Sequence, residues 1–76
     1  MPIPPLHHDS NGNEYFEVAN IRITRVMAAS RPPSKNWSGG DTIRVQGIGI
    51  NGPIPGAEFS VDEVPNAVQA MLELFQ

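Results

Sequence analysis

Hydrophobic and polar residues alternate in two stretches of this chain, and each alternation predicts β-structure. In the first stretch, from Tyr15 to Met27, Phe16 and Val18 have one parity while Ile21 and Ile23 have the other. A one-residue change of parity sends side chains to the opposite face of a sheet, so a bulge or tight bend between the two pairs lets both face one core. We therefore expect one bent strand or two short strands here.

The second alternating stretch runs from Thr42 to Ile50, and its opening repeats the pattern of the first. Ile21-Arg22-Ile23-Thr24 and Ile43-Arg44-Val45-Gln46 both have the order β-branched, Arg, β-branched, polar. If these strands pair, an apolar face and a face of Arg, Thr and Gln form together. Asn51-Gly52 is a hairpin-turn dipeptide, and the prolines after it leave room for a short edge strand at 57–59.

The C-terminal segment has the pattern of a capped amphipathic helix. Ser60 and Glu63 have the spacing of a capping box. Pro65 removes one intrahelical hydrogen bond, so we expect a separate 3₁₀ turn before the main helix. An apolar stripe follows at helical spacing, made of Val64, Val68, Met71, Leu72 and Phe75. This stripe is expected in the core, and in a domain this small it can continue into a dimer contact.

These elements predict one α+β domain, residues 1–76, in which a three- or four-stranded antiparallel sheet packs against one C-terminal helix. Residues 1–13 are expected to form an extended Pro-rich arm and a turn, residues 14–59 the sheet with a long loop at 28–40, and residues 60–76 the helix. A chain of 76 residues without Cys has no disulfide to stabilise it. We therefore expect a homodimer.

All five positively charged residues lie between Arg22 and Arg44, whereas seven of the eight acids lie outside this segment. Such a segment can bind a partner, or it can pair with the acids of its own chain. We predict that it contacts a protein partner. The residues expected at this contact are Arg22, Arg25, Arg31, Lys35, Trp37 and Arg44.

Two features of this segment leave alternatives open. If their strands are neighbours, Arg22 and Arg44 form a clamp for a carboxylate or another anion; otherwise they are two arginines on a solvated face. Lys35 and Trp37 place a cation near an aromatic ring, a combination that single-strand nucleic-acid binders use. The net charge of −3 is unlike that of such binders and favours a protein partner.

The sequence gives little indication of catalysis, metal binding or cofactor binding. Adjacent His7 and His8 point to opposite faces of a strand, and the chain has no Cys and no third His to complete a metal site. Neither His has an orienting partner or a nucleophile in a recognisable context. Gly47-Ile48-Gly49 lacks the third Gly of a dinucleotide-binding loop. We therefore expect a protein that is not an enzyme and has no metal or cofactor.

No apolar run has the length of a signal peptide or a membrane span, so we expect a cytoplasmic protein without membrane contact. The function that fits these observations is a small non-enzymatic binding module. It would act as a regulator, inhibitor or adaptor through contact with another protein, as many small proteins of phages and plasmids do.

The second half of the chain has the order strand, Asn-Gly turn, Pro-Gly, short strand and capped helix. The residues that carry this order are Ile43-Arg44, Asn51-Gly52, Pro55-Gly56, Phe59-Ser60 and Val64 to Phe75. The order resembles the end of the transcriptional coactivator family called positive cofactor four, in which a curved antiparallel sheet and a C-terminal helix form dimers that bind single-stranded DNA. The resemblance implies that topology and, as the alternative function, a dimer that binds single-stranded nucleic acid. The family carries Lys where this chain has Ala57-Glu58, and it is basic where this chain is acidic.

Overall fold

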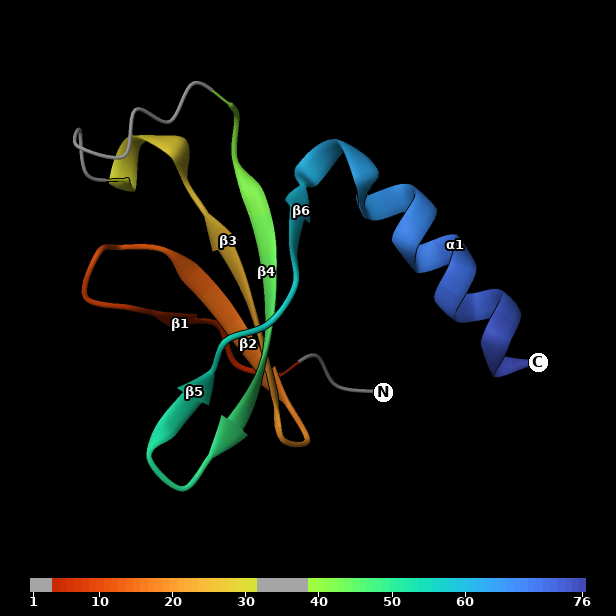
Figure 1. Ribbon diagram of the computed structural model, residues 1–76, viewed down its shortest axis with the longest axis horizontal. Helices are drawn as coiled ribbons and strands as arrows, with labels where there is room; N and C mark the ends of the chain where they lie inside the picture. Colours follow the sequence, from red (N-terminus) through yellow and green to blue (C-terminus); the bar gives the residue numbers. More distant parts are fainter. Residues whose placement is uncertain (1–3, 32–38) are drawn as a thin grey trace.

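An antiparallel sheet and one C-terminal helix make up the fold in the computed structural model, which describes residues 4–31 and 39–76 (Figure 1). Within these residues the sheet has six strands, β1 (His7–His8), β2 (Glu14–Val18), β3 (Ile21–Val26), β4 (Thr42–Gly49), β5 (Gly52–Ile54) and β6 (Glu58–Ser60). The predicted α+β class is confirmed. The short edge strand expected at 57–59 is present as β6. The sheet has more strands than three or four because β1 and β5 are only two and three residues long, too short to show an alternating pattern.

The strands follow one another across the sheet in chain order, from β1 to β5. β5 and β6 share one edge of β4: β5 pairs with its second half and β6 with its first half. Between them the chain passes close to β4 at Gly56, where a Cβ atom would lie 1.9 Å from the carbonyl oxygen of Val45. Glycine is therefore required for the chain to return along this edge.

A two-residue turn joins β2 to β3 and explains the change of parity in the sequence. Val18 pairs with Ile21 across the turn Ala19-Asn20, and Phe16 pairs with Ile23. Ala19 has a φ of 54°, a left-handed conformation that costs a residue with a Cβ about 1 kcal/mol. Of the two expected arrangements, the structure thus has two short strands with both apolar pairs on one face.

The strand registers give the sheet one apolar face and one polar face, as the repeated pattern predicts. Ile23 lies opposite both Phe16 and Val45, and Ile43 lies opposite Phe59, so these side chains share the apolar face. One cross-strand row of the polar face consists of His7, Tyr15, Thr24, Arg44 and Glu58.

The expected turn at residues 9–13 closes β1 onto β2. The Asp9 carboxylate accepts hydrogen bonds from the backbone N–H groups of Asn11 and Asn13, both at 2.9 Å. Asn13 is 4% exposed, and its side-chain oxygen accepts hydrogen bonds from the Met27 N–H and the Ser30 hydroxyl. The turn is thereby bound to the 3₁₀ turn η1 (Ala28–Ser30), which begins the expected loop at 28–40.

The helix follows Ser60 as predicted, but the capping box expected of Ser60 and Glu63 is not formed: the Glu63 carboxylate accepts a hydrogen bond from the Asn66 side chain instead. The Ser60 hydroxyl accepts a hydrogen bond from the Asp62 N–H at 3.2 Å, and the 3₁₀ turn η3 (Val61–Glu63) precedes α1 (Val64–Phe75). A separate first turn is thus confirmed, and Pro65 lies at the start of α1, where its missing N–H is tolerated.

α1 lies on the apolar side of the sheet but diverges from it. In Figure 1 the helix begins beside β6, and its C-terminal end stands away from the strands. Among the described residues, Val26 is the only buried hydrophobic one; the other buried residues are Asn13, Thr24 and Thr42. Strand alternation places all four on the polar side of the sheet. The apolar side therefore stays largely open.

Candidate functional site

Glu58 is the centre of the charged network on the polar face. Its Oε1 accepts a hydrogen bond from Arg44 Nε at 3.0 Å, and its Oε2 accepts one from the Thr42 hydroxyl at 2.8 Å and forms an ion pair with Arg31. Burial raises the pKa of this carboxyl group, but hydrogen bonds from Arg31, Thr42 and Arg44 outweigh that effect and hold the pKa at about 2. Glu58 therefore ties β6 to β4 and to the segment after η1.

Arg22 belongs to a second cluster on the same face. Its Nη2 lies 3.0 Å from Glu17 Oε2, and its guanidinium carbon lies 4.3 Å from the centroid of the Tyr15 ring. The Tyr15 ring also stacks on His7, at 5.2 Å between ring centroids. The guanidinium is thus held by a carboxylate and an aromatic face at once.

Arg25 has the opposite parity and pairs with the acid at the start of β4. Its Nη2 lies 3.0 Å from Asp41 Oδ2, while Asp41 Oδ1 accepts a hydrogen bond from the Ala28 N–H. These two donors, the backbone of Ala28 first, lower the pKa of Asp41. The pairing closes the ends of β3 and β4 against η1.

The predicted contact residues are therefore bound mainly to acids of their own chain. Each of the four arginines in residues 4–31 and 39–76 belongs to an ion pair. Arg22 and Arg44 lie on one face of neighbouring strands, as an anion clamp requires, yet each binds a different carboxylate. Lys35 and Trp37 lie outside the described residues. The contact of all six with a partner stays a prediction.

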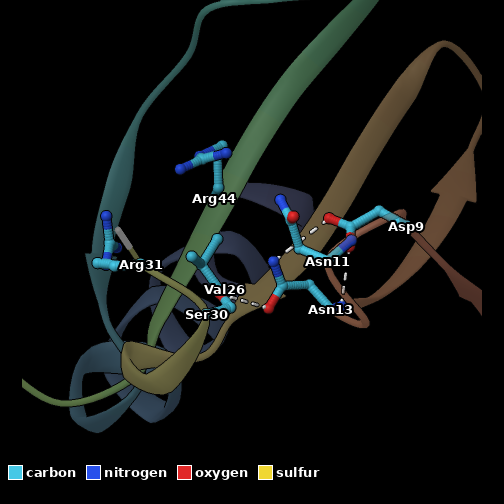
Figure 2. Close-up of a pocket in the computed structure, with 7 residues that line it drawn as sticks. All are labelled: Asp9, Asn11, Asn13, Val26, Ser30, Arg31 and Arg44. Atoms are coloured by element: carbon cyan, nitrogen blue, oxygen red, sulfur yellow. Dashed lines mark hydrogen bonds between the residues drawn. The ribbon is translucent and has the colours of Figure 1, made fainter. Parts of the chain in front are cut away.

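Arg31 and Arg44 also border a polar hollow of about 290 Å³ (Figure 2). The residues lining it are Asp9, Asn11, Asn13, Val26, Ser30, Arg31 and Arg44. Figure 2 shows that several of these side chains bind one another: Asn13 lies between Asp9 and Ser30 and forms hydrogen bonds with both. The hollow thus joins the turn at 9–13 to the end of β3.

An apolar groove of about 300 Å³ lies on the other side of the sheet, between the strands and α1. Every residue that lines it is apolar. The sheet contributes Ile21, Ile23, Ile43, Val45 and Phe59, and the helix contributes Val64, Ala67, Val68 and Met71. Because the helix diverges from the sheet, Ile21 remains 44% exposed and Met71 61% exposed. The groove is therefore lined by side chains that the fold brings together but leaves open to solvent.

The apolar surface continues beyond this groove. In the last turn of α1, Leu72, Leu74 and Phe75 are 54%, 86% and 88% exposed. Val18, the neighbour of Ile21 across the β2–β3 turn, is 49% exposed. With the open part of the groove, these side chains expose on the order of 600 Å² of apolar surface, at the upper end of the roughly 300–600 Å² that the largest apolar patch of a monomer covers, and such patches are often functional.

Comparisons with protein-family models, with curated proteins and with solved structures find no match for this chain. Its function must therefore be argued from its own surfaces. In the described part of the chain, no helix is long and apolar enough to cross a membrane. That part also holds no group of three or more His, Cys, Asp or Glu residues placed to share a metal ion.

The sequence placed the contact surface in the basic segment, whereas the structure exposes the helix stripe that was expected in the core. The sequence did show the stripe. The expectation that the stripe can continue into a dimer contact was the one indication that it forms a contact surface. Leu74 lies beside the stripe, at i+3 from Met71, and was missed. Asn13 was also missed as a buried polar residue, because its partners Met27 and Ser30 become neighbours only through the strand register.

Proposed function

We propose that this protein is a small non-enzymatic binding module that acts on another protein as a regulator, inhibitor or adaptor. Its binding surface would be the apolar groove together with the last turn of α1. The exposure of Leu74 and Phe75, at 86% and 88%, carries this proposal. Large apolar side chains gathered on one side of a small domain are typical of a surface that another protein covers.

The chemistry of the groove specifies the kind of partner. All of its lining residues are apolar, so binding there would be driven by burial of apolar side chains. An amphipathic helix fits such a surface, because its i, i+3, i+4 and i+7 side chains form one apolar strip. The partner we propose is therefore a protein that presents an amphipathic helix.

The polar face supports a contact less strongly. A partner that binds Arg22 or Arg44 has to compete with Glu17 and Glu58, whose carboxylates lie about 3 Å from the guanidinium groups. A nucleic acid, the alternative partner, would also approach a chain of net charge −3. These charges favour the apolar surface.

Site-specific photocrosslinking tests the proposal. A benzophenone amino acid is introduced at position 75, and in a matched variant at Gln69, which lies on the polar side of the same helix. After irradiation in the producing cells, position 75 should give adducts with a protein other than this chain, and position 69 few such adducts. Equal yields at the two positions would count against the groove. Salt-dependent binding of single-stranded DNA by the purified chain would instead support the alternative function.

A further inference from the structure

We infer that the partner of the apolar groove is a second copy of this chain. The last turn of α1 of each copy would dock in the groove of the other, so that the helix end and the groove are covered by one reciprocal contact. This inference rests on the proposed function, since it names the occupant of the same surface; another protein would bind there by displacing the second copy with an amphipathic helix of its own.

The first argument is the area that a single chain leaves exposed. The accessible surface is 5956 Å², against about 4,600 Å² for a compact monomer of this mass. The Cα radius of gyration is 13.5 Å, against about 11 Å for a compact domain of this length. If two copies covered their apolar surfaces, on the order of 1,200 Å² would be removed from water, which exceeds the roughly 1,000 Å² that a specific interface needs.

The second argument is that both halves of the contact are present on one chain. The groove is an apolar hollow that lacks an occupant in the described part of the chain, and Leu72, Leu74 and Phe75 are apolar side chains without a comparable pocket. In a two-fold dimer each copy contributes the same patch to the interface. If that patch contains both an apolar hollow and an apolar protrusion, the protrusion of each copy can fill the hollow of the other. Figure 1 shows the protruding end of α1 clear of the strands, where a second copy can reach it.

The third argument is that the charges of the chain do not oppose this docking. The lining of the groove is uncharged, and helical spacing puts Glu73 on the side of α1 opposite the stripe. Asp62 and Glu63 lie at the start of the helix, away from its docking end. The net charge of −3 on each copy is screened over about 8 Å at physiological ionic strength.

Sedimentation equilibrium of the full chain tests the inference, with Phe75→Ser as the disrupting variant. Phe75 is 88% exposed in one copy, so its replacement should leave the fold and its circular dichroism unchanged. The wild-type chain should be a dimer at micromolar concentration, and Phe75→Ser should raise the dissociation constant about 30-fold or more. Gln69→Ala, on the polar side of the same helix, should dimerise like the wild type.

Crosslinking with mixed isotopes locates the contact. A benzophenone at position 75 of an unlabelled copy should form an adduct with β3 or β4 of a ¹⁵N-labelled copy. A wild-type monomer, or a dimer that Phe75→Ser does not weaken, overturns the inference. If position 75 then crosslinks to a different protein, the proposed function stands without the inference; if it crosslinks no better than position 69, both are wrong.

Discussion

Replacing Glu58 with Gln should destabilise the protein at neutral pH and remove much of its sensitivity to acid. The carboxylate of Glu58 in β6 binds Thr42 and Arg44 of β4 and Arg31 of the segment after η1. Gln keeps the size and one acceptor oxygen of Glu but loses the negative charge. The substitution therefore removes the two ion pairs while it preserves the shape of the side chain.

The size and sign of the effect follow from the pKa of Glu58. The pKa is about 2 in the folded protein, against 4.5 for an unperturbed Glu. A lowered pKa contributes stability that is fully present above about pH 4.5 and is lost as the pH falls through about 2. A shift of this size corresponds to about 3 kcal/mol. Because the Glu58 side chain is 26% exposed, solvent screening reduces the expected loss to about 1 to 2 kcal/mol.

Urea denaturation followed by circular dichroism, at one protein concentration and at several pH values between 7 and 2, measures this effect. Glu58→Gln should be less stable than the wild type at pH 7, and the two curves should converge toward pH 2. Glu73→Gln removes the same charge from the polar side of α1 and should change the free energy of unfolding by less than about 0.5 kcal/mol. A difference between Glu58→Gln and the wild type that is independent of pH would refute the reasoning.

Two further substitutions test the contacts that fix the sheet. Gly56→Ala places a Cβ 1.9 Å from the Val45 carbonyl oxygen and should reduce the free energy of unfolding by about 3 kcal/mol or more. Gly40→Ala is the control: a Cβ there meets no described atom within 4 Å, so the free energy of unfolding should change by less than about 0.5 kcal/mol. Equal effects of the two substitutions in urea titrations would contradict this prediction. Asn13→Ala leaves the Met27 N–H without its acceptor and should cost about 2 kcal/mol, with faster amide exchange at Met27; unchanged exchange would show that the bond is not formed.

Local patterns in the sequence were sufficient to predict the larger elements. The change of parity between Val18 and Ile21 indicated the bend that the structure forms as a two-residue turn. The spacing of Ser60 and Glu63 indicated the start of the helix. β5 could not be predicted in the same way, because three residues show no periodicity, and β6 was predicted only as a short edge strand without a partner. Their pairing with β4 depends on the close approach of Gly56, which is a tertiary contact.

The partners of the arginines could not be predicted for a related reason. Arg44 and Arg31 are 14 and 27 residues from Glu58 in the sequence. They share its carboxylate only because β6 pairs with β4 in a register that places Glu58 opposite Arg44. The positions of the charged residues along the chain identified the basic segment. The strand register then decides which acids of the same chain lie close enough to pair with its arginines.

The openness of the apolar face also depends on geometry that the sequence does not contain. The stripe on α1 and the apolar face of the sheet have matching chemistry, and their matching patterns predicted that they pack together. The chain reaches α1 through β6, at the edge of the sheet, and the helix leaves that edge at an angle that opens the groove. Hydrophobic patterning predicts which surfaces avoid water, and the direction in which the helix leaves the sheet decides whether one copy of the chain can cover them.

The polar and apolar sides of the sheet therefore contribute different things to this molecule. On the polar side, the buried side chains of Asn13 and Thr42 and the carboxylate of Glu58 form hydrogen bonds that fit only one strand register. Such buried polar contacts add little net stability, but they penalise every alternative pairing that leaves a donor or acceptor unpaired. Burial of apolar surface is the main source of stability in small domains, and here most of that surface is still exposed in one copy. A fold whose register is fixed on one side and whose apolar surface is uncovered on the other is well suited to gain its remaining stability from a partner.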